Sequence, residues 1–508
     1  MSKGFGRMEL TDTQKKIVDT AGNLIVRASA GTGKTHTMVA KIAKEIDENK
    51  DHRVIAAITF TIKAAREIKE RLSVDITGYF IGTNNSFAIE EVIKPFMKDA
   101  YGVQFDCEMT TDYSLKFDNY EEGLNFISEN CTLGSYEDNN KNFIFELALK
   151  ILRKSEVARL YLQAKYFKIY VDEYQDCDTA MNEFFMYLTD SLTIDLFIVG
   201  DDKQSLYTWR GANPEAFKSI IGKRNFEKFF MVDNFRSNKQ IQNYSNLLFE
   251  ETSSLYDQQT SIENIILLNC TEQDWIEKIK CFWDADKSSA LLRFSNSNAK
   301  SAADILCAND MDFKFIPKAP IEDISNDAGW LYYAIAQYLL VDTYSVFDFI
   351  YDIPSGTEED SKIKSKLERF LQGLKTNVVD ENQFKEKVSE LATFLGYEAQ
   401  PKDLSALYET ISTDRYIEAF KSDNINHRAM TFHSSKGLQF DQVILFVEDY
   451  NLRDEVSFYN HYVATTRAKS KLIFISIKEN YGTRLFYQNI AKRLGASGLT
   501  LDKLVTIY

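Results

Sequence analysis

The sequence lacks the features that mark several large classes of protein. No apolar run approaches the roughly 20 residues that cross a membrane, and the first ten residues contain no apolar core of a signal peptide. We therefore expect a cytoplasmic protein that does not associate with a membrane. The six cysteines are scattered, with no pair at metal-ligand spacing, which predicts reduced thiols and argues against a zinc or iron–sulfur site.

The composition is that of a globular protein whose charges are segregated along the chain. The 508 residues are 44% apolar, enough for about two to four domains with cores. The net charge is −15, and residues 99–146 contain eleven acidic residues against two lysines. A predicted helix that follows Thr61 carries four basic residues, Lys63, Arg66, Lys69 and Arg71. Because the charges are segregated, the negative total does not exclude a basic groove for nucleic acid.

A phosphate-binding loop is the most informative motif in the chain. The apolar run 24–26 predicts a strand, and it is followed by Ala28, Ser29, Ala30, Gly31, Thr32, Gly33, Lys34 and Thr35. A helix-forming run from Met38 completes the strand–loop–helix context that the motif requires. Backbone N–H groups of such a loop surround nucleotide phosphates, while Lys34 reaches the β- and γ-phosphates and Thr35 binds Mg²⁺. We therefore predict a site for a nucleoside triphosphate.

Carboxylates and an amide follow two further predicted strands. The run 167–171 ends in Asp172 and Glu173, and the run 196–199 leads to Gln204. Carboxylates at the end of a buried strand are costly unless they hold a cation. Asp172 is predicted to reach Mg²⁺ through its water shell, and Glu173 to act as general base toward the attacking water. The Gln204 amide can sense the γ-phosphate, so this group of residues predicts nucleotide hydrolysis.

An aromatic segment follows Gln204. Tyr207 and Trp209 lie on one side of a predicted extended segment, with Arg210 beside them. Aromatic rings next to a cation suit single-stranded nucleic acid, whose bases stack with about 1–3 kcal/mol each. The alternative is packing in a core, because 13% of the residues are aromatic and a single tryptophan is usually buried.

Further segments complete a known order of motifs. Gln14 precedes the phosphate loop, residues 234–237 read Asn-Phe-Arg-Ser, and two more motifs occupy 431–441 and 462–469. Between residues 10 and 470 the chain thus resembles the superfamily 1A helicases of the UvrD/Rep type. The resemblance implies an α/β fold of two RecA-like parallel-sheet lobes, with a mostly helical insertion in each.

The resemblance also implies four domains, of which lobe 1A carries the ATP site. Each lobe is interrupted by its insertion, so the expected boundaries are 1–83 and 156–232 for lobe 1A, 84–155 for the acidic insertion 1B, 233–309 and 421–508 for lobe 2A, and 310–420 for the helical insertion 2B. Only 39 residues follow Lys469, so we expect no fused nuclease domain.

Roles for individual residues follow from the resemblance. Gln14 corresponds to the glutamine that recognises adenine, and Arg236 and Arg467 correspond to arginines that contact the γ-phosphate, Arg467 as the arginine finger. Arginines of this kind are worth about 10³–10⁵ in rate. The implied cofactors are ATP and Mg²⁺, and the implied movement on DNA is 3′ to 5′. The nucleic-acid groove is expected to use Phe60, Lys63, Tyr207, Trp209, Arg210 and His433.

Several positions depart from the family. His36 replaces an arginine that usually stacks on the base, and Phe235 replaces a tyrosine on the other side of the base. A neutral imidazole and a phenyl ring still stack, but with less cation–π attraction. We therefore predict weaker base affinity and a less strict choice of purine, with Gln14 still favouring adenine. Asn84 and Asn85 stand where the family has Phe-His, which removes the support for one nucleic-acid contact.

Insertion 1B is short and acidic. Its residues 99–146 carry a local charge of −9, which would repel the DNA phosphates that the larger insertions of relatives contact. Two interpretations stay open: a solvated polar face, or a docking surface for a basic protein partner.

The compact length and the run 52–65 resemble a narrower family, the helicase-like B subunits of the Gabija anti-phage system. That resemblance implies a Gabija A-like nuclease partner with ATPase-like and Toprim domains, assembled with this chain in a hetero-oligomer. It also implies hydrolysis that is switched on by DNA ends or single-stranded DNA. The alternatives are a free-standing 3′–5′ DNA repair helicase and a DNA-sensing scaffold whose ATPase matters little. Intact Lys34, Glu173 and Arg467 argue against the scaffold.

Overall fold

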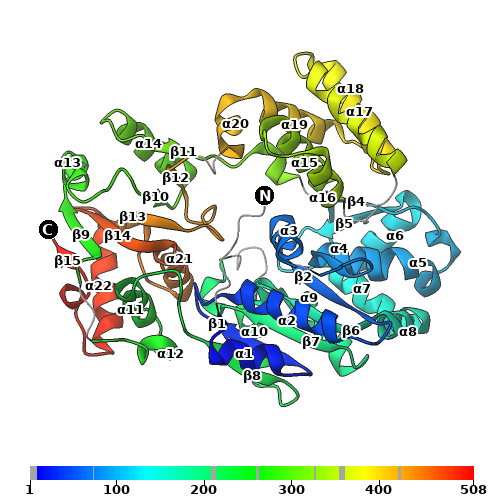
Figure 1. Ribbon diagram of the computed structural model, residues 1–508, viewed down its shortest axis with the longest axis horizontal. Helices are drawn as coiled ribbons and strands as arrows, with labels where there is room; N and C mark the ends of the chain where they lie inside the picture. The colour runs from blue at the N-terminus through cyan, green and yellow to red at the C-terminus, as the bar shows by residue number, and fades with distance from the viewer. Residues whose placement is uncertain are drawn as a thin grey trace. The chain divides into compact units, whose positions relative to one another are not determined.

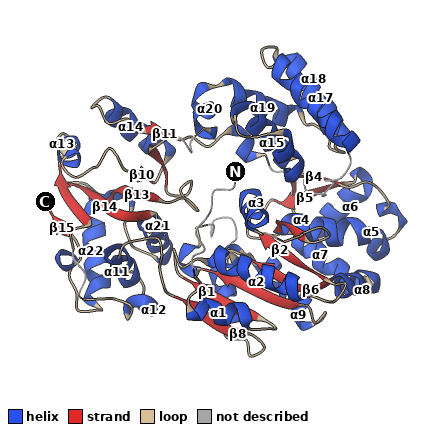
Figure 2. Cartoon of the chain, in the orientation of Figure 1, coloured by secondary structure: helices blue, strands red, loops and turns tan. Residues whose placement is uncertain are grey.

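The computed structural model describes residues 9–72, 74–206, 213–258, 262–324, 328–353, 361–421 and 425–508. They form two compact units, each assembled from segments that are separate in the sequence (Figure 1). The first unit comprises Met1–Asp233, Ile324–Ile335 and Ser345–Pro401, and the second comprises Asn234–Asp323, Ala336–Tyr344 and Lys402–Tyr508. Both units contain helices and strands (Figure 2).

A six-stranded parallel sheet forms the centre of the first unit, in the order β3-β2-β6-β7-β1-β8. Its strands are β1 (Leu24–Ala28), β2 (Val54–Thr59), β3 (Phe80–Thr83), β6 (Tyr166–Val171), β7 (Asp195–Gly200) and β8 (Glu227–Met231). Most of them are apolar runs because both faces of the sheet are covered.

Alternate residues of β1 show how the two faces are covered. Leu24 and Val26 belong to a core that includes residues of α1 (Asp12–Asp19), α2 (Lys34–Glu48) and α3 (Ile62–Arg71). Ile25 belongs to a second core, which includes residues of α9 (Thr179–Asp190) and α10 (Pro214–Ile221). Since successive side chains of a strand point to opposite faces, the sheet lies between these two helix layers.

The segment between β3 and β6 combines helices with a small sheet. Its helices are α4 (Asn84–Ala88), a π-helix (Ile89–Ile93), α5 (Lys94–Tyr101), α6 (Tyr120–Asn130), α7 (Phe143–Lys154) and α8 (Glu156–Lys165). Two strands, β4 (Thr110–Phe117) and β5 (Thr132–Tyr136), pair in parallel on either side of α6 in the sequence. The pair is absent from the sequence-based expectations, because its formation depends on contacts between segments that α6 separates.

Cys107 and Cys131 form a disulfide in this segment, with their Cα atoms 6.2 Å apart. The prediction of six reduced thiols is therefore wrong for this pair. Cys107 precedes β4 and Cys131 caps α6 directly before β5, so the pairing of the two strands brings the thiols together. Their separation of 24 residues carries no local signal of the contact. The free cysteines of the described residues are Cys177, Cys270, Cys281 and Cys307.

Helices from later in the chain complete the first unit. They are α16 (Val346–Asp352), α17 (Ser361–Asn377) and α18 (Glu381–Phe394), and α17 packs on α18. α16 reaches back to α3, where Arg66 pairs with Asp352 at 3.0 Å and with Asp348 at 3.4 Å. Part of the basic charge of α3 is therefore neutralised inside the unit.

A seven-stranded parallel sheet forms the centre of the second unit, in the order β11-β12-β10-β13-β14-β9-β15. Its strands are β9 (Ile265–Cys270), β10 (Ser289–Arg293), β11 (Lys314–Phe315), β12 (His427–Thr431), β13 (Phe440–Phe446), β14 (Ala468–Ile477) and β15 (Thr506–Ile507). The further helices are α11 (Lys239–Leu247), α12 (Glu250–Ser253), α13 (Trp275–Lys280), α14 (Asn296–Cys307), α19 (Pro401–Ser412), α20 (Asp414–Phe420), α21 (Glu455–Thr465) and α22 (Tyr481–Gly495), while α15 (Gly329–Leu340) is shared between the units.

The centre of the second unit contains a buried aromatic cluster. Phe474 of β14 contacts the rings of Tyr244, His461 and Phe486, which come from α11, α21 and α22. The hydroxyl of Tyr244 lies 2.8 Å from His461 Nε2. Burial lowers the pKa of His461 to about 3, so the imidazole is neutral and packs as part of the core.

Both units have the predicted architecture, an α/β fold with two RecA-like parallel sheets and helical insertions. The four domain boundaries stay a prediction. Among the described helices, none is long and apolar enough to cross a membrane.

Candidate nucleotide-binding site

The loop between β1 and α2 has the backbone of a phosphate-binding loop. Gly31 and Gly33 have φ angles of +77° and +80°, a left-handed conformation that glycine adopts without strain. Gly33 caps the 15-residue helix α2, whose first turn begins with Lys34, Thr35 and His36. First-turn N–H groups lack partners within their helix, and the helix dipole adds positive potential there. The loop and this helix end can therefore bind an anion such as a phosphate group.

Hydrogen bonds hold the loop from two sides. Ser29 donates its N–H to the Met231 carbonyl at 3.1 Å, and its own carbonyl accepts from the Thr32 hydroxyl at 2.8 Å. Gln14 Nε2 donates to the Thr32 carbonyl at 3.2 Å, while Gln14 Oε1 accepts the Thr11 N–H at 2.9 Å. The side chain that the family resemblance assigns to adenine thus fixes the loop, and its contact with adenine stays a prediction.

Lys34, Asp172 and Glu173 meet where β6 ends. Lys34 Nζ lies 3.2 Å from Glu173 Oε1, and the Glu173 N–H donates to Asp172 Oδ1 at 2.8 Å. Burial and the Glu173 carboxylate raise the pKa of Asp172 to about 7, against the attraction of Lys34. Glu173 has a φ of +51°, which costs a non-glycine residue on the order of 1–3 kcal/mol. The surrounding structure therefore imposes the position of Glu173.

The oxygen donors near the loop suit Mg²⁺. Thr35 offers a hydroxyl in the first turn of α2, and Asp172 offers a carboxylate directly after β6. Mg²⁺ is usually held by one or two carboxylates, with water and substrate phosphates completing its octahedral shell. These two donors fit that chemistry. A cluster of three or more His, Cys, Asp or Glu side chains that could hold a metal does not occur among the described residues.

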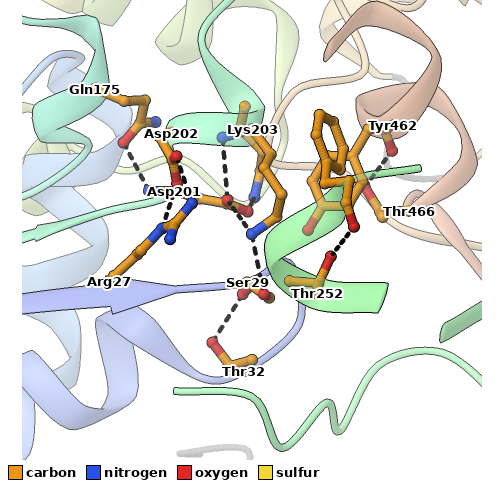
Figure 3. A network of polar contacts seen from close by, with 12 residues as sticks. Arg27, Ser29, Thr32, Gln175, Asp201, Asp202, Lys203, Thr252, Tyr462 and Thr466 are labelled. Carbon is orange, nitrogen blue, oxygen red and sulfur yellow. Dashed lines mark hydrogen bonds and ion pairs between the residues drawn. The ribbon is translucent and has the colours of Figure 1, made fainter. Parts of the chain in front are cut away.

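Ionic contacts connect the loop after β7 to the end of β1 and to the phosphate loop (Figure 3). Arg27 binds Asp202 through two hydrogen bonds of 2.8 and 2.7 Å. Lys203 Nζ lies 3.2 Å from Ser29 Oγ and 3.1 Å from Asp201 Oδ1. Charge-assisted contacts of this kind are strong when they are buried, so they fix the two loops relative to each other. The sequence signal for them was a run of charged residues that directly follows a buried strand.

Gln204 lies in the same loop. Its Nε2 donates to Asp201 Oδ2 at 2.7 Å. The Asp201 N–H in turn donates to Gln175 Oε1 at 2.9 Å, and Gln175 Nε2 donates to the Glu173 carboxylate. A chain of hydrogen bonds therefore runs from the predicted γ-phosphate sensor to the predicted base. Gln175 has no role in the sequence-based predictions, although it stands two residues after Glu173.

The two predicted arginines lie together in the second unit. Arg236 Nη1 donates to the Thr466 carbonyl at 3.1 Å, and Arg467 Nη2 donates to the Thr466 hydroxyl at 3.3 Å. Arg467 is buried and also donates from Nε to the Val463 carbonyl at 2.9 Å, so its position is fixed by α21. Phe235 is 45% exposed beside Arg236. Contacts of these side chains with a nucleotide stay predictions.

The predicted nucleic-acid residues come from several elements. Phe60 follows β2 and packs against the core of the first unit, and Lys63 is exposed on α3. In the second unit, the rings of His433 and its neighbour Phe432 lie against each other at a tilt of 33°, with their centroids 4.0 Å apart. Outside the described residues lie Tyr207, Trp209 and Arg210.

Asn84 and Asn85 take part in contacts within the first unit. Asn84 is buried, and its side chain lies 3.4 Å from Met181 Sδ. Asn85 donates to the Tyr113 hydroxyl at 3.2 Å. The two residues at this departure from the family pattern therefore join α4 to α9 and β4.

Comparison with known proteins agrees with this geometry. Residues 10–131 and 140–225 match the UvrD/REP helicase N-terminal domain, and residues 352–476 match the viral superfamily 1 RNA helicase core domain. The chain is 39% identical over 482 residues to the Gabija protein GajB of Bacillus cereus, which covers 92% of this chain and 96% of GajB.

Two helicases are more distant relatives. The chain is 28% identical over 357 residues to a probable DNA helicase II homolog of Rickettsia conorii, covering 58% of this chain and 52% of the relative. It is 26% identical over 304 residues to the ATP-dependent DNA helicase Rep of Escherichia coli, covering 49% and 44%. The matches span about half the length of these two relatives. The chain belongs to the family of the Gabija protein GajB, among the UvrD/Rep-type helicases.

Proposed function

We propose that this chain is the DNA-sensing, nucleotide-hydrolysing subunit of a Gabija-like anti-phage defence complex. The observation that carries the proposal is the group formed by Lys34, Asp172 and Glu173, with Lys34 Nζ 3.2 Å from Glu173 Oε1 beside the phosphate loop. A buried carboxylate with a raised pKa, as at Asp172, beside a second carboxylate and a lysine is typical of catalytic sites. The relative that is 39% identical is named as a Gabija protein, which supports the assignment to defence.

The proposed reaction is hydrolysis of ATP. The N–H groups of residues 31–35 bind the phosphates, and Lys34 neutralises the charge of the β- and γ-phosphates. Thr35 and Asp172 hold Mg²⁺, which supplies further neutralisation of phosphate charge when bound. Glu173 accepts a proton from the water that attacks the γ-phosphorus, and the bond to the β-phosphate oxygen breaks, releasing ADP and phosphate.

Further residues act on the same phosphate. Gln204 contacts the γ-phosphate, and its bond to Asp201 orients its amide. Arg236 and Arg467 stabilise the charge that develops on the transferring group, a contribution that is typically worth about 10³–10⁵ in rate.

DNA is the proposed activator of hydrolysis. Single-stranded DNA or DNA ends bind along Phe60, Lys63 and His433, with bases stacked on the aromatic rings. Tyr207, Trp209 and Arg210 are proposed to bind the same strand, as the family resemblance implies. Movement along the strand is proposed to run 3′ to 5′, as is typical of the family.

A nuclease partner completes the proposed complex. This partner is Gabija A-like, with ATPase and Toprim domains, and it forms a hetero-oligomer with this chain. The acidic residues of 99–146 offer it a surface of negative charge, which suits a basic partner. Exposed positions for a test are Glu121, Glu129 and Glu137, whose reversal to lysine should weaken partner binding and leave ATP hydrolysis intact.

A free-standing 3′–5′ DNA repair helicase is the second candidate. The similarity to Rep and to DNA helicase II favours it. Affinity purification from the native cells separates the two. A nuclease that co-purifies in fixed stoichiometry supports the defence complex, whereas a chain that purifies without one supports repair.

The direct test is ATP hydrolysis by the purified chain, with and without single-stranded DNA. Stimulation by DNA that Glu173→Gln abolishes supports a DNA-dependent ATPase. Equal hydrolysis by wild type and Glu173→Gln would refute the site. If DNA stimulates hydrolysis only weakly while Glu173→Gln still abolishes it, activation requires the partner. Wild type and Glu173→Gln are then compared in the complex.

A further inference from the structure

We propose that Gln175 is a positioning residue for hydrolysis, which holds the carboxylate of Glu173 in place and connects it to the loop that carries Gln204. The inference rests on the proposed role of Glu173 as the base. Gln175 is fully buried, and both ends of its amide are used. Its Nε2 donates to Glu173 Oε2, and its Oε1 accepts the Asp201 N–H at 2.9 Å.

The two oxygens of Glu173 have different partners. Oε1 lies 3.2 Å from Lys34 Nζ, while Oε2 accepts from Gln175. This division keeps the carboxylate from turning both oxygens to Lys34, and it leaves more of the lysine charge for phosphate. Two contacts, one at each oxygen, define a single orientation of the carboxylate more closely than the lysine contact alone would.

The other end of the amide reaches β7. Asp201 directly follows β7, and its carboxylate binds Gln204 at 2.7 Å and Lys203 at 3.1 Å. Lys203 in turn contacts Ser29 of the phosphate loop at 3.2 Å. A change at the phosphate loop or at Gln204 therefore reaches Glu173 through Asp201 and Gln175. Figure 3 shows the part of this path that runs from Ser29 through Lys203 and Asp201 to Gln175.

The Gln175 amide fits beside the end of β7 because residue 200 has no side chain. Gly200 precedes Asp201, and a Cβ at Gly200 would lie 2.6 Å from Gln175 Oε1. The Gln175 carbonyl also accepts from the Ser205 hydroxyl at 3.2 Å. Side chain and backbone of Gln175 are thus both fixed to the loop after β7.

The test uses Gln175→Met and Gln175→Glu in the full chain, with single-stranded DNA present. Methionine keeps the volume and removes both hydrogen bonds. Glutamate keeps an acceptor for the Asp201 N–H and removes the donor to Glu173. We expect kcat to fall at least tenfold in both, with the KM for ATP changed less than threefold.

Gln240 provides the matched control. It is also a buried glutamine, whose Oε1 accepts the Asn264 N–H at 2.7 Å and whose Nε2 donates to the Leu504 carbonyl at 3.0 Å. Gln240→Met therefore removes an equivalent pair of bonds in the second unit, and it should leave kcat within twofold of wild type.

The outcomes separate this inference from the proposed function. If Glu173→Gln loses hydrolysis while Gln175→Met keeps its kcat, the positioning role of Gln175 is overturned, and the proposed function of Glu173 stands. Hydrolysis that survives Glu173→Gln overturns both. Parallel losses of kcat, KM and thermal stability in Gln175→Met and Gln240→Met show a structural role only, which also overturns the inference.

Discussion

Replacing Gly200 by alanine should disturb the hydrogen bonds of Gln175 without changing Gln175 itself. The new Cβ would lie 2.6 Å from Gln175 Oε1, and 3.3 Å from both the Gln175 backbone nitrogen and Phe217 Cζ, so the severe clash is with the glutamine oxygen alone. The glutamine oxygen is the end of a flexible side chain, so it moves away and the fold survives. The buried Asp201 N–H then loses its partner, which costs about 1–3 kcal/mol of unfolding free energy.

The effect on catalysis follows from the same displacement. The displaced amide also loses its hydrogen bond to Glu173. If this loss costs a comparable free energy, the activation free energy rises by about 1–3 kcal/mol, and kcat falls about 5- to 150-fold. We expect DNA-stimulated phosphate release to show this loss, with little change in the KM for ATP. Stability is measured in parallel by chemical denaturation.

Gly373→Ala is the control for Gly200→Ala. Gly373 lies within α17, and a Cβ there meets nothing within 4 Å. The substitution should stabilise the helix by about 0.5–1 kcal/mol and leave kcat unchanged. Full kcat in Gly200→Ala, or an equal loss in Gly373→Ala, would refute the reasoning.

Three further predictions address the base, the disulfide and the buried histidine. His36→Arg combined with Phe235→Tyr should raise the preference for ATP over GTP about 2- to 5-fold through cation–π contact; a wild-type preference above a hundredfold in hydrolysis at equal concentration contradicts a less strict choice of purine. Cys107→Ser should lower the unfolding free energy by about 3 kcal/mol under oxidising conditions, because it opens a loop closed over 24 residues. Cys281→Ser, at a free and exposed thiol, is the control, and equal stability of the two variants rules out the bond. Because the pKa of His461 is lowered to about 3, the unfolded chain binds the extra proton below about pH 6.5. The free energy of unfolding therefore has its full value above that pH, and it is about 1.4 kcal/mol lower at pH 5.5. His461→Phe should lack this loss in denaturation at the two pH values, and identical slopes would contradict the assignment.

Local motifs made much of the first unit predictable. The strand–loop–helix around the phosphate loop is defined by adjacent residues, and β1 and α2 lie on either side of Gly31 and Gly33. The runs expected at 167–171 and 196–199 form β6 and β7 with one or two more residues each. Such motifs are visible in sequence because one backbone conformation and one hydrophobic run carry them.

Contacts between distant segments could not be predicted in the same way. Arg27 meets Asp202 across 175 residues, and the disulfide depends on the pairing of β4 with β5. Gln175 is only two residues from Glu173 in the sequence. Its role depends on Asp201, which follows β7 and is brought next to Gln175 by the fold. Periodicity contains no information about which strand ends become neighbours, so these parts of the site needed the structure.

The pairing of Arg66 with Asp348 and Asp352 bears on how α3 responds to salt. A DNA phosphate that binds Arg66 has to displace three carboxylates of the protein itself, because Glu70 also lies 2.8 Å from Arg66 Nε. Most protein–DNA contacts instead release dissolved ions, and this release makes binding fall steeply as salt rises. Added salt weakens the phosphate contact and the carboxylate contact together, so the two effects oppose each other at this residue. Arg66 therefore contributes less to the salt dependence of DNA binding than its charge alone would give.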